Sequence, residues 1–139
     1  LAKVDWPTGD PKRGSRLFAN RACQGCHSGA GALGPDLKGS ANRFSPKDLY
    51  RAILFPNRDI SPLYRFTEYR MRNGDVHTGR TAFYAAEGVV LRTGVGIVRL
   101  DQADIQSTKP SQRSIMPEGL LEGLGEGDLA DLFQYIKSL

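Results

Sequence analysis

Two cysteines and a histidine within five residues carry the clearest chemistry in this sequence. Cys23 and Cys26 are separated by two residues, and His27 follows directly. This C-x-x-C-H spacing is typical of covalent c-type haem attachment. Each thiol can form a thioether with one vinyl group of a porphyrin, and the short spacer brings both sulfurs to the same edge of the ring. His27 then falls under the iron, where an imidazole nitrogen can serve as an axial ligand.

Two other uses of a cysteine pair have to be weighed against haem. A structural zinc site needs four ligands, and beyond the motif the chain offers only His77. A thioredoxin-like dithiol should lie between a strand and a helix in a βαβ pattern, and no such pattern precedes Cys23. The sequence therefore predicts one covalently bound haem, held through Cys23 and Cys26, and no structural disulfide.

Three side chains compete for the second axial position on the iron. Met116 precedes Pro117 in an irregular segment, so its thioether can be held at the metal, and His/Met ligation raises the reduction potential. Met71 precedes a hairpin turn and is better explained by packing. His77 lies just past that turn and is expected at the surface. We predict Met116 as the ligand, with an open or water-bound site as the alternative.

The ligating histidine also needs a partner for its second ring nitrogen. Such a nitrogen usually donates to a backbone carbonyl or carboxylate, which fixes the orientation of the ring. A glycine-rich loop, residues 28–34, follows His27 and leads into Pro35. We therefore predict that the Pro35 carbonyl is this partner.

Helix signals surround the motif. Asp10-Pro11 and Ser45-Pro46 each combine an N-cap residue with proline at the first helical position. They predict helices from Pro11 to Asn20 or Ala22 and over 46–54. Apolar residues at i, i+3, i+4 and i+7 predict a last helix starting near Glu126 or Asp128.

Strand signals occupy the segment 64–105. Alternating polarity, an Asn73-Gly74 turn and two β-rich runs predict a small antiparallel sheet of three or four strands. Residues 106–114 are polar and are expected to form a loop.

Composition limits the remaining classes of function. The formal net charge is +4, and the basic residues are scattered without any nucleic-acid-binding motif. No run approaches the roughly 20 apolar residues that cross a bilayer. The chain begins at Leu1, which suggests a processed or excised fragment. Because haem is joined to cysteines outside the cytoplasm, we expect a periplasmic or otherwise extracytoplasmic protein.

Taken together, these motifs resemble a class I cytochrome c over about residues 8–63 and 111–139. The resemblance implies a mainly α fold, in which the first and last helices cross with Gly14 and Phe18 against the Phe133–Tyr135 region. It also implies Pro35 as the carbonyl partner and Met116 as the distal ligand. The segment 64–105 would then be a small β-sheet insertion in a single cytochrome c domain, 1–139.

A closer resemblance is to the haem-binding domain typical of planctomycetes and verrucomicrobia. It is carried by Gly-Pro-Asp-Leu (34–37), Ile-Leu-Phe-Pro-Asn (53–57), Asn-Gly-Asp (73–75), Met-Pro-Glu-Gly-Leu-Leu (116–121) and Asp-Leu-Ala-Asp-Leu (128–132). This likeness runs nearly end to end and includes the β insertion. It implies a domain of a larger secreted or membrane-associated protein, such as a sugar dehydrogenase.

The expected function is electron transfer without catalysis, either as a free carrier or as the electron-accepting domain of a dehydrogenase. The expected partner is a redox protein, either a dehydrogenase or a terminal oxidase or reductase, which the basic surface could steer. The alternative is a haem enzyme or gas sensor with an open distal site. A docking role for the β insertion, with Tyr69, Phe83, Tyr84 and the arginine-rich strands as candidate contacts, can coexist with electron transfer.

Overall fold

The computed structural model describes residues 1–29 and 31–139; position 30 of the glycine-rich loop lies outside the described residues. The chain divides into two compact units. A helical unit comprises residues 1–59 and 116–139, and a β unit comprises residues 60–115. None of the described helices is long and apolar enough to cross a membrane.

The helical unit contains five α-helices and a short 3₁₀ segment, Trp6–Thr8. The helices are α1 (Pro11–Asn20), α2 (Cys23–His27), α3 (Ser40–Arg43), α4 (Pro46–Leu54) and α5 (Glu126–Ser138). The expected caps are present: the Asp10 side chain accepts from Lys12 N, and the Ser45 side chain accepts from Asp48 N. These local bonds explain why α1 and α4 begin at the predicted residues.

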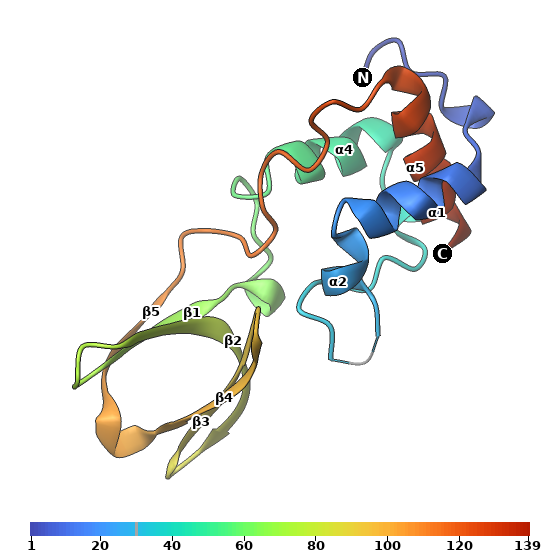
Figure 1. Cartoon of the computed structure of the whole chain (residues 1–139). Coiled ribbons are helices and arrows are strands. Elements are labelled where there is room, and N and C mark those ends of the chain that lie inside the picture. The colour runs from blue at the N-terminus through green and yellow to red at the C-terminus, as the bar shows by residue number, and fades with distance from the viewer. Residues whose placement is uncertain (30) are drawn as a thin grey trace. The chain divides into compact units, whose positions relative to one another are not determined.

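Helices α1 and α5 pack directly against each other (Figure 1). The Phe18 and Tyr135 rings lie 5.2 Å apart, as the resemblance implied. The core around this crossing consists of Phe18, Tyr50, Leu132, Phe133 and Ile136. Trp6 covers it, with ring centroids 5.1 Å from Tyr50 and 5.5 Å from Phe133.

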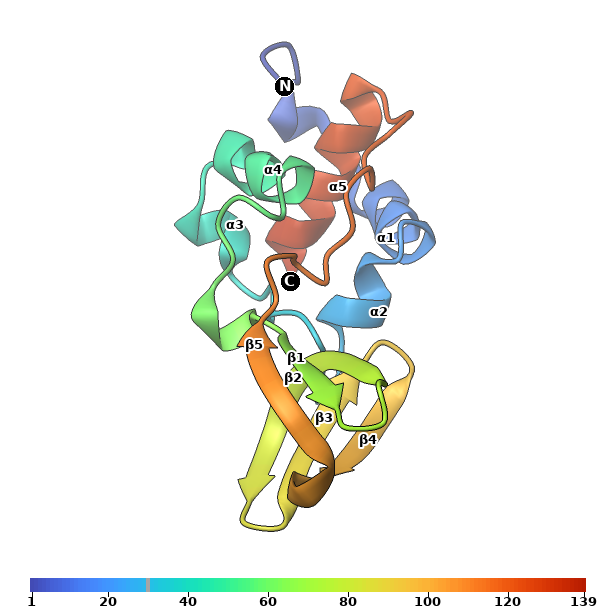
Figure 2. The same cartoon turned by 90° about the vertical axis from the view of Figure 1, so that its left-hand side faces the viewer.

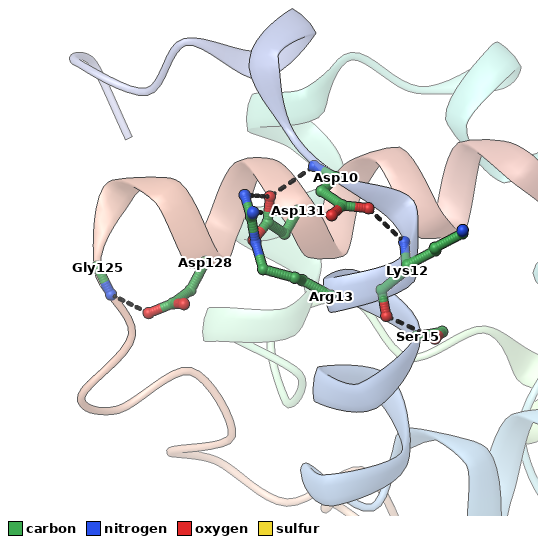
Figure 3. A network of polar contacts seen from close by, with 7 residues as sticks. All are labelled: Asp10, Lys12, Arg13, Ser15, Gly125, Asp128 and Asp131. Carbon is green, nitrogen blue, oxygen red and sulfur yellow. Dashed lines mark hydrogen bonds and ion pairs between the residues drawn. The ribbon is translucent and has the colours of Figure 1, made fainter.

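A buried carboxylate fastens the start of α1 to α5 (Figure 3). Asp131 Oδ1 accepts from Asp10 N at 2.6 Å and from Arg13 Nη2 at 2.9 Å, while Oδ2 accepts from Arg13 Nε at 2.6 Å. The hydrogen bond from Arg13 holds the pKa of Asp131 below its usual range. A charge this buried, 3% exposed, is tolerated because both of its oxygens are paired.

The β unit is a five-stranded antiparallel sheet in the order β4-β3-β2-β1-β5. The strands are β1 (Thr67–Met71), β2 (Val76–Ala85), β3 (Gly88–Thr93), β4 (Gly96–Asp101) and β5 (Ile105–Pro110). Strand β2 pairs with β1 through its first half and with β3 through its second, and the register shifts between Thr81 and Phe83. The sheet is strongly curved (Figures 1 and 2). Its core is a cluster of buried side chains: Tyr69, Met71, Val89, Leu91, Leu100 and Ile105.

The expectation of a mainly α fold is wrong. Helices account for 36% of the chain and the antiparallel sheet for 24%, so the protein is a mixed α and β structure. The helices are short, and the sheet is larger than the predicted three or four strands over 64–105. Its fifth strand, β5, occupies part of the segment expected to be a loop. This strand was missed because only Ile105 is buried in it, so no alternation of polarity marks it.

Candidate functional site

A cavity of about 410 Å³ lies within the helical unit. Its walls include Cys23 and His27 from α2, Pro35 from the following loop, and Met116 from the segment before α5. Most of the other lining side chains are apolar: Phe18, Leu37, Phe44, Leu49, Ala52, Ile53, Leu121, Leu132 and Ile136. Its volume lies in the range of roughly 300–1,000 Å³ of small-molecule and cofactor sites, which are also mainly apolar.

His27 is oriented by the backbone of the loop that follows α2. Its Nδ1 lies 2.8 Å from the carbonyl oxygen of Pro35. Because a carbonyl oxygen only accepts, this contact requires the proton on Nδ1 and leaves a lone pair on Nε2. An imidazole in this tautomer, with its second nitrogen held by a carbonyl, is the usual arrangement of a metal-ligating histidine.

Gly34 makes the approach of this loop to the ring possible. Its N–H donates to the Cys26 carbonyl at 2.8 Å. A Cβ at this position would lie 2.9 Å from His27 Cε1 and 3.0 Å from both His27 Nδ1 and the Cys26 oxygen. The backbone must therefore lack a side chain here if the ring is to stay in place.

Both cysteines are free thiols in α2 and both are half-buried. Burial raises the pKa of the Cys23 thiol, so this group stays protonated at neutral pH. Cys23 lines the cavity, whereas Cys26 is not among the described residues that do so. Ala22, immediately before the pair, has a φ of 62°, a left-handed conformation that is unfavourable for a residue with a Cβ.

The segment that carries Met116 is tied to the rest of the helical unit at two points. Asn57 Nδ2 donates to Glu118 Oε1 at 2.7 Å, and Arg21 Nη1 donates to the Glu122 carbonyl at 2.8 Å. Glu118 and Glu122 both belong to the turn, residues 118–123, that follows Met116. A thioether on such a fastened segment has a defined position at the cavity wall.

The other two candidate ligands lie in the β unit. Met71 is 6% exposed and belongs to the core of the sheet, as packing predicted. His77 is half-buried in β2 and pairs with Tyr69 across the β1–β2 ladder. Neither lines the described cavity.

Sequence reasoning missed three polar residues at the cavity: Ser40, Asp48 and Arg58. Asp48 accepts from the Ser45 hydroxyl at 2.6 Å, and Arg58 Nε donates to Asp59 at 2.7 Å. Ser40 opens α3, a helix of four residues that is too short to produce a periodic pattern. No signal in the sequence would have brought these residues together, because tertiary packing alone does so.

The comparisons agree with this chemistry. The family described as "Cytochrome C oxidase, cbb3-type, subunit III" matches residues 9–63, which span α1 to α4 and include the C-x-x-C-H motif. The match supports a c-type cytochrome. It ends before the sheet and before Met116. A comparison with curated proteins gives no match.

The described residues fit a haem. The Cys23 thiol, the His27 imidazole held at Nδ1 by a carbonyl, and the Met116 thioether all line one mainly apolar cavity, and the second thiol lies in the same short helix as the first. Imidazole and thioether groups are among the axial ligands found on haem iron in proteins. The segment that matches the cytochrome family therefore supplies most of the lining of a cavity of suitable chemistry.

Proposed function

We propose that the chain is an electron-transfer c-type cytochrome carrying one haem, with His27 and Met116 as axial ligands. The proposal rests mainly on the His27–Pro35 contact beside an apolar cavity that Cys23 and Met116 also line. When bound, haem supplies a one-electron couple between Fe(II) and Fe(III). The match over residues 9–63 supports haem binding and electron transfer.

Different residues of the chain would bind the porphyrin edge and the iron of this haem. Each thiol of Cys23 and Cys26 would add across one vinyl group, so that a carbon–sulfur bond forms and the thiol hydrogen passes to carbon without any oxidant. His27 would offer the Nε2 lone pair, while Pro35 keeps the proton on Nδ1. Met116 would offer its thioether from the other segment. The apolar lining excludes water, which favours the ferrous state over the more highly charged ferric state.

Partner and location follow from this proposal. We propose an extracytoplasmic protein, because covalent haem attachment takes place outside the cytoplasm, and a redox protein as its partner. The family that matches residues 9–63 is named for a subunit of a cytochrome c oxidase. By analogy, the partner is a terminal oxidase or reductase, or a dehydrogenase. The resemblance to the planctomycete and verrucomicrobial haem-binding domain is part of this proposal, since it alone extends over the β unit.

The two methionines of the chain provide a matched test of the distal ligand. Met116→Leu and Met71→Leu each remove one thioether with little change in side-chain volume, which usually costs less than about 1.5 kcal/mol. In haem-loaded protein, M116L should lose the methionine–iron absorption band and show a lower reduction potential, whereas M71L should keep both. If M116L keeps the band, Met116 is not the ligand. If the wild type lacks the band and binds carbon monoxide readily, the open-site alternative is favoured.

A further inference from the structure

Ser40 contains a buried hydroxyl with no hydrogen-bond partner among the described residues. The residue is 5% exposed, and its backbone groups are already used: its N–H donates to the Leu37 carbonyl and its carbonyl accepts from Phe44 N. Buried hydroxyls in folded proteins almost always have a partner, because an unpaired one loses its bonds to water without compensation. The Ser40 Oγ therefore requires an explanation.

The position of Ser40 indicates what its partner is. It lines the same cavity as Cys23, His27 and Met116, and most of the other lining side chains are apolar. The lining also contains the Asp48 carboxylate, but none of the described residues accepts a hydrogen bond from Ser40 Oγ. The hydroxyl is thus one of a few polar groups in a mainly apolar cavity, which is typical of a site where such groups orient a ligand.

Haem offers few atoms that could accept this hydrogen bond. Its ring edge is hydrocarbon and its four nitrogens are bound to iron, so the accepting atoms that remain are the oxygens of its two carboxylates. We propose that Ser40 is a positioning residue whose Oγ–H donates to one haem carboxylate. This inference rests on the proposed function. Arg58 lines the same cavity; its Nε is paired with Asp59, and its other guanidinium N–H groups would be donors for the same carboxylates.

This hydrogen bond should influence the iron. A hydroxyl that points its positive end at a carboxylate offsets part of that negative charge. Without the hydroxyl, the surroundings of the iron are more negative, and the ferric state is favoured. We expect Ser40→Ala to shift the equilibrium constant between ferrous and ferric haem about twofold to tenfold in favour of the ferric state. A tenfold shift corresponds to a fall of 59 mV in the reduction potential for one electron.

The experiment compares reduction potentials of haem-loaded variants of the 139-residue chain by optical titration. Ser40→Ala removes the hydroxyl, and Ser40→Thr keeps it. Ser138→Ala is the control, because Ser138 is exposed in the last turn of α5, donates to the Tyr135 carbonyl and does not line the described cavity. The potential should fall in S40A, stay close to the wild-type value in S40T, and be unchanged in S138A. A crystal structure of the haem-loaded wild type should place Ser40 Oγ within about 3 Å of a carboxylate oxygen.

Each other result overturns the inference in a recognisable way. If S40A has the wild-type potential, or if Oγ bonds an ordered water or a backbone carbonyl in the crystal, Ser40 has no role toward the carboxylate while the haem assignment stands. If the wild-type protein carries no haem after maturation, the proposed function fails together with the inference. The mass of the wild-type protein distinguishes these two cases before any variant is made.

Discussion

Gly14 is a point of very close approach between α1 and α5, and replacing it with alanine tests this crossing. The added Cβ would lie 2.6 Å from the Asp131 carbonyl carbon, 2.8 Å from Tyr135 Cβ, and closer still to the Asp131 carbonyl oxygen. Real Cβ atoms essentially never come within 3.0 Å of such neighbours. Because the nearest obstacles are backbone atoms of α5, they cannot rotate away, and the two helices must separate.

The size of the effect follows from two opposing contributions. Forcing an extra methyl group into a packed interior typically costs 1–3 kcal/mol, and a backbone obstacle favours the upper end of this range. The higher helix propensity of alanine stabilises the folded state by about 1 kcal/mol relative to glycine. We therefore expect Gly14→Ala to lower the free energy of unfolding by about 2 kcal/mol. At roughly 4 °C per kcal/mol for a domain of this size, Tm should fall by about 8 °C.

Thermal and denaturant unfolding of the haem-loaded protein, followed by circular dichroism, measures this change. Gly127→Ala is the matched control, because it makes the same substitution in α5 at a site where, apart from its chain neighbours and the nearby backbone of its own helix, no described atom lies within 4 Å of the new Cβ. This control should be neutral or gain up to about 1 kcal/mol. If G14A proves as stable as G127A, the close crossing of α1 and α5 is refuted.

Two more predictions concern the histidine and the buried carboxylate. Gly34→Ala should push the His27 ring out of place, since the new Cβ would lie 2.9 Å from Cε1, and the ferric spectrum should show more high-spin iron than the wild type. Asp131→Asn should destabilise the protein at pH 7, where the paired carboxylate contributes to stability. Because the folded pKa is lowered, that contribution is complete well above pH 3.8 and is lost as the pH falls through the folded value. The difference in unfolding midpoint between wild type and D131N should therefore shrink in acid, and a constant difference would contradict this.

Local chemistry made most of the helices predictable. The Asp10 and Ser45 caps act on residues two and three positions away, at 2.8 and 3.2 Å, so the helix starts could be read directly from the sequence. The His27–Pro35 contact was predictable for a similar reason, because the two residues are eight positions apart on one short loop. Each of these features depends on neighbours in the sequence.

Features that depend on distant residues could not be predicted. Strand β5 pairs with β1 through backbone hydrogen bonds. All of its side chains except the first are exposed, so no alternation of apolar and polar residues predicts the pairing. This is why the sheet exceeds the three or four predicted strands. The expectation of a mainly α fold has another source, the resemblance to a class I cytochrome c, which covers only the helical parts of the chain. Ser40 enters the cavity because α3 packs near α5, almost a hundred residues away in the chain. Arg13 and Asp131 meet for the same reason.

Peptide mass spectrometry of protein matured in a host that attaches c-type haem is the most direct test of the central claim. Trypsin cleaves after Arg21 and Lys38, so the peptide 22–38 contains both cysteines and His27. We predict that this peptide carries the mass of one haem, and that Cys23→Ala/Cys26→Ala protein carries none. A wild-type peptide 22–38 with two unmodified thiols would contradict the account.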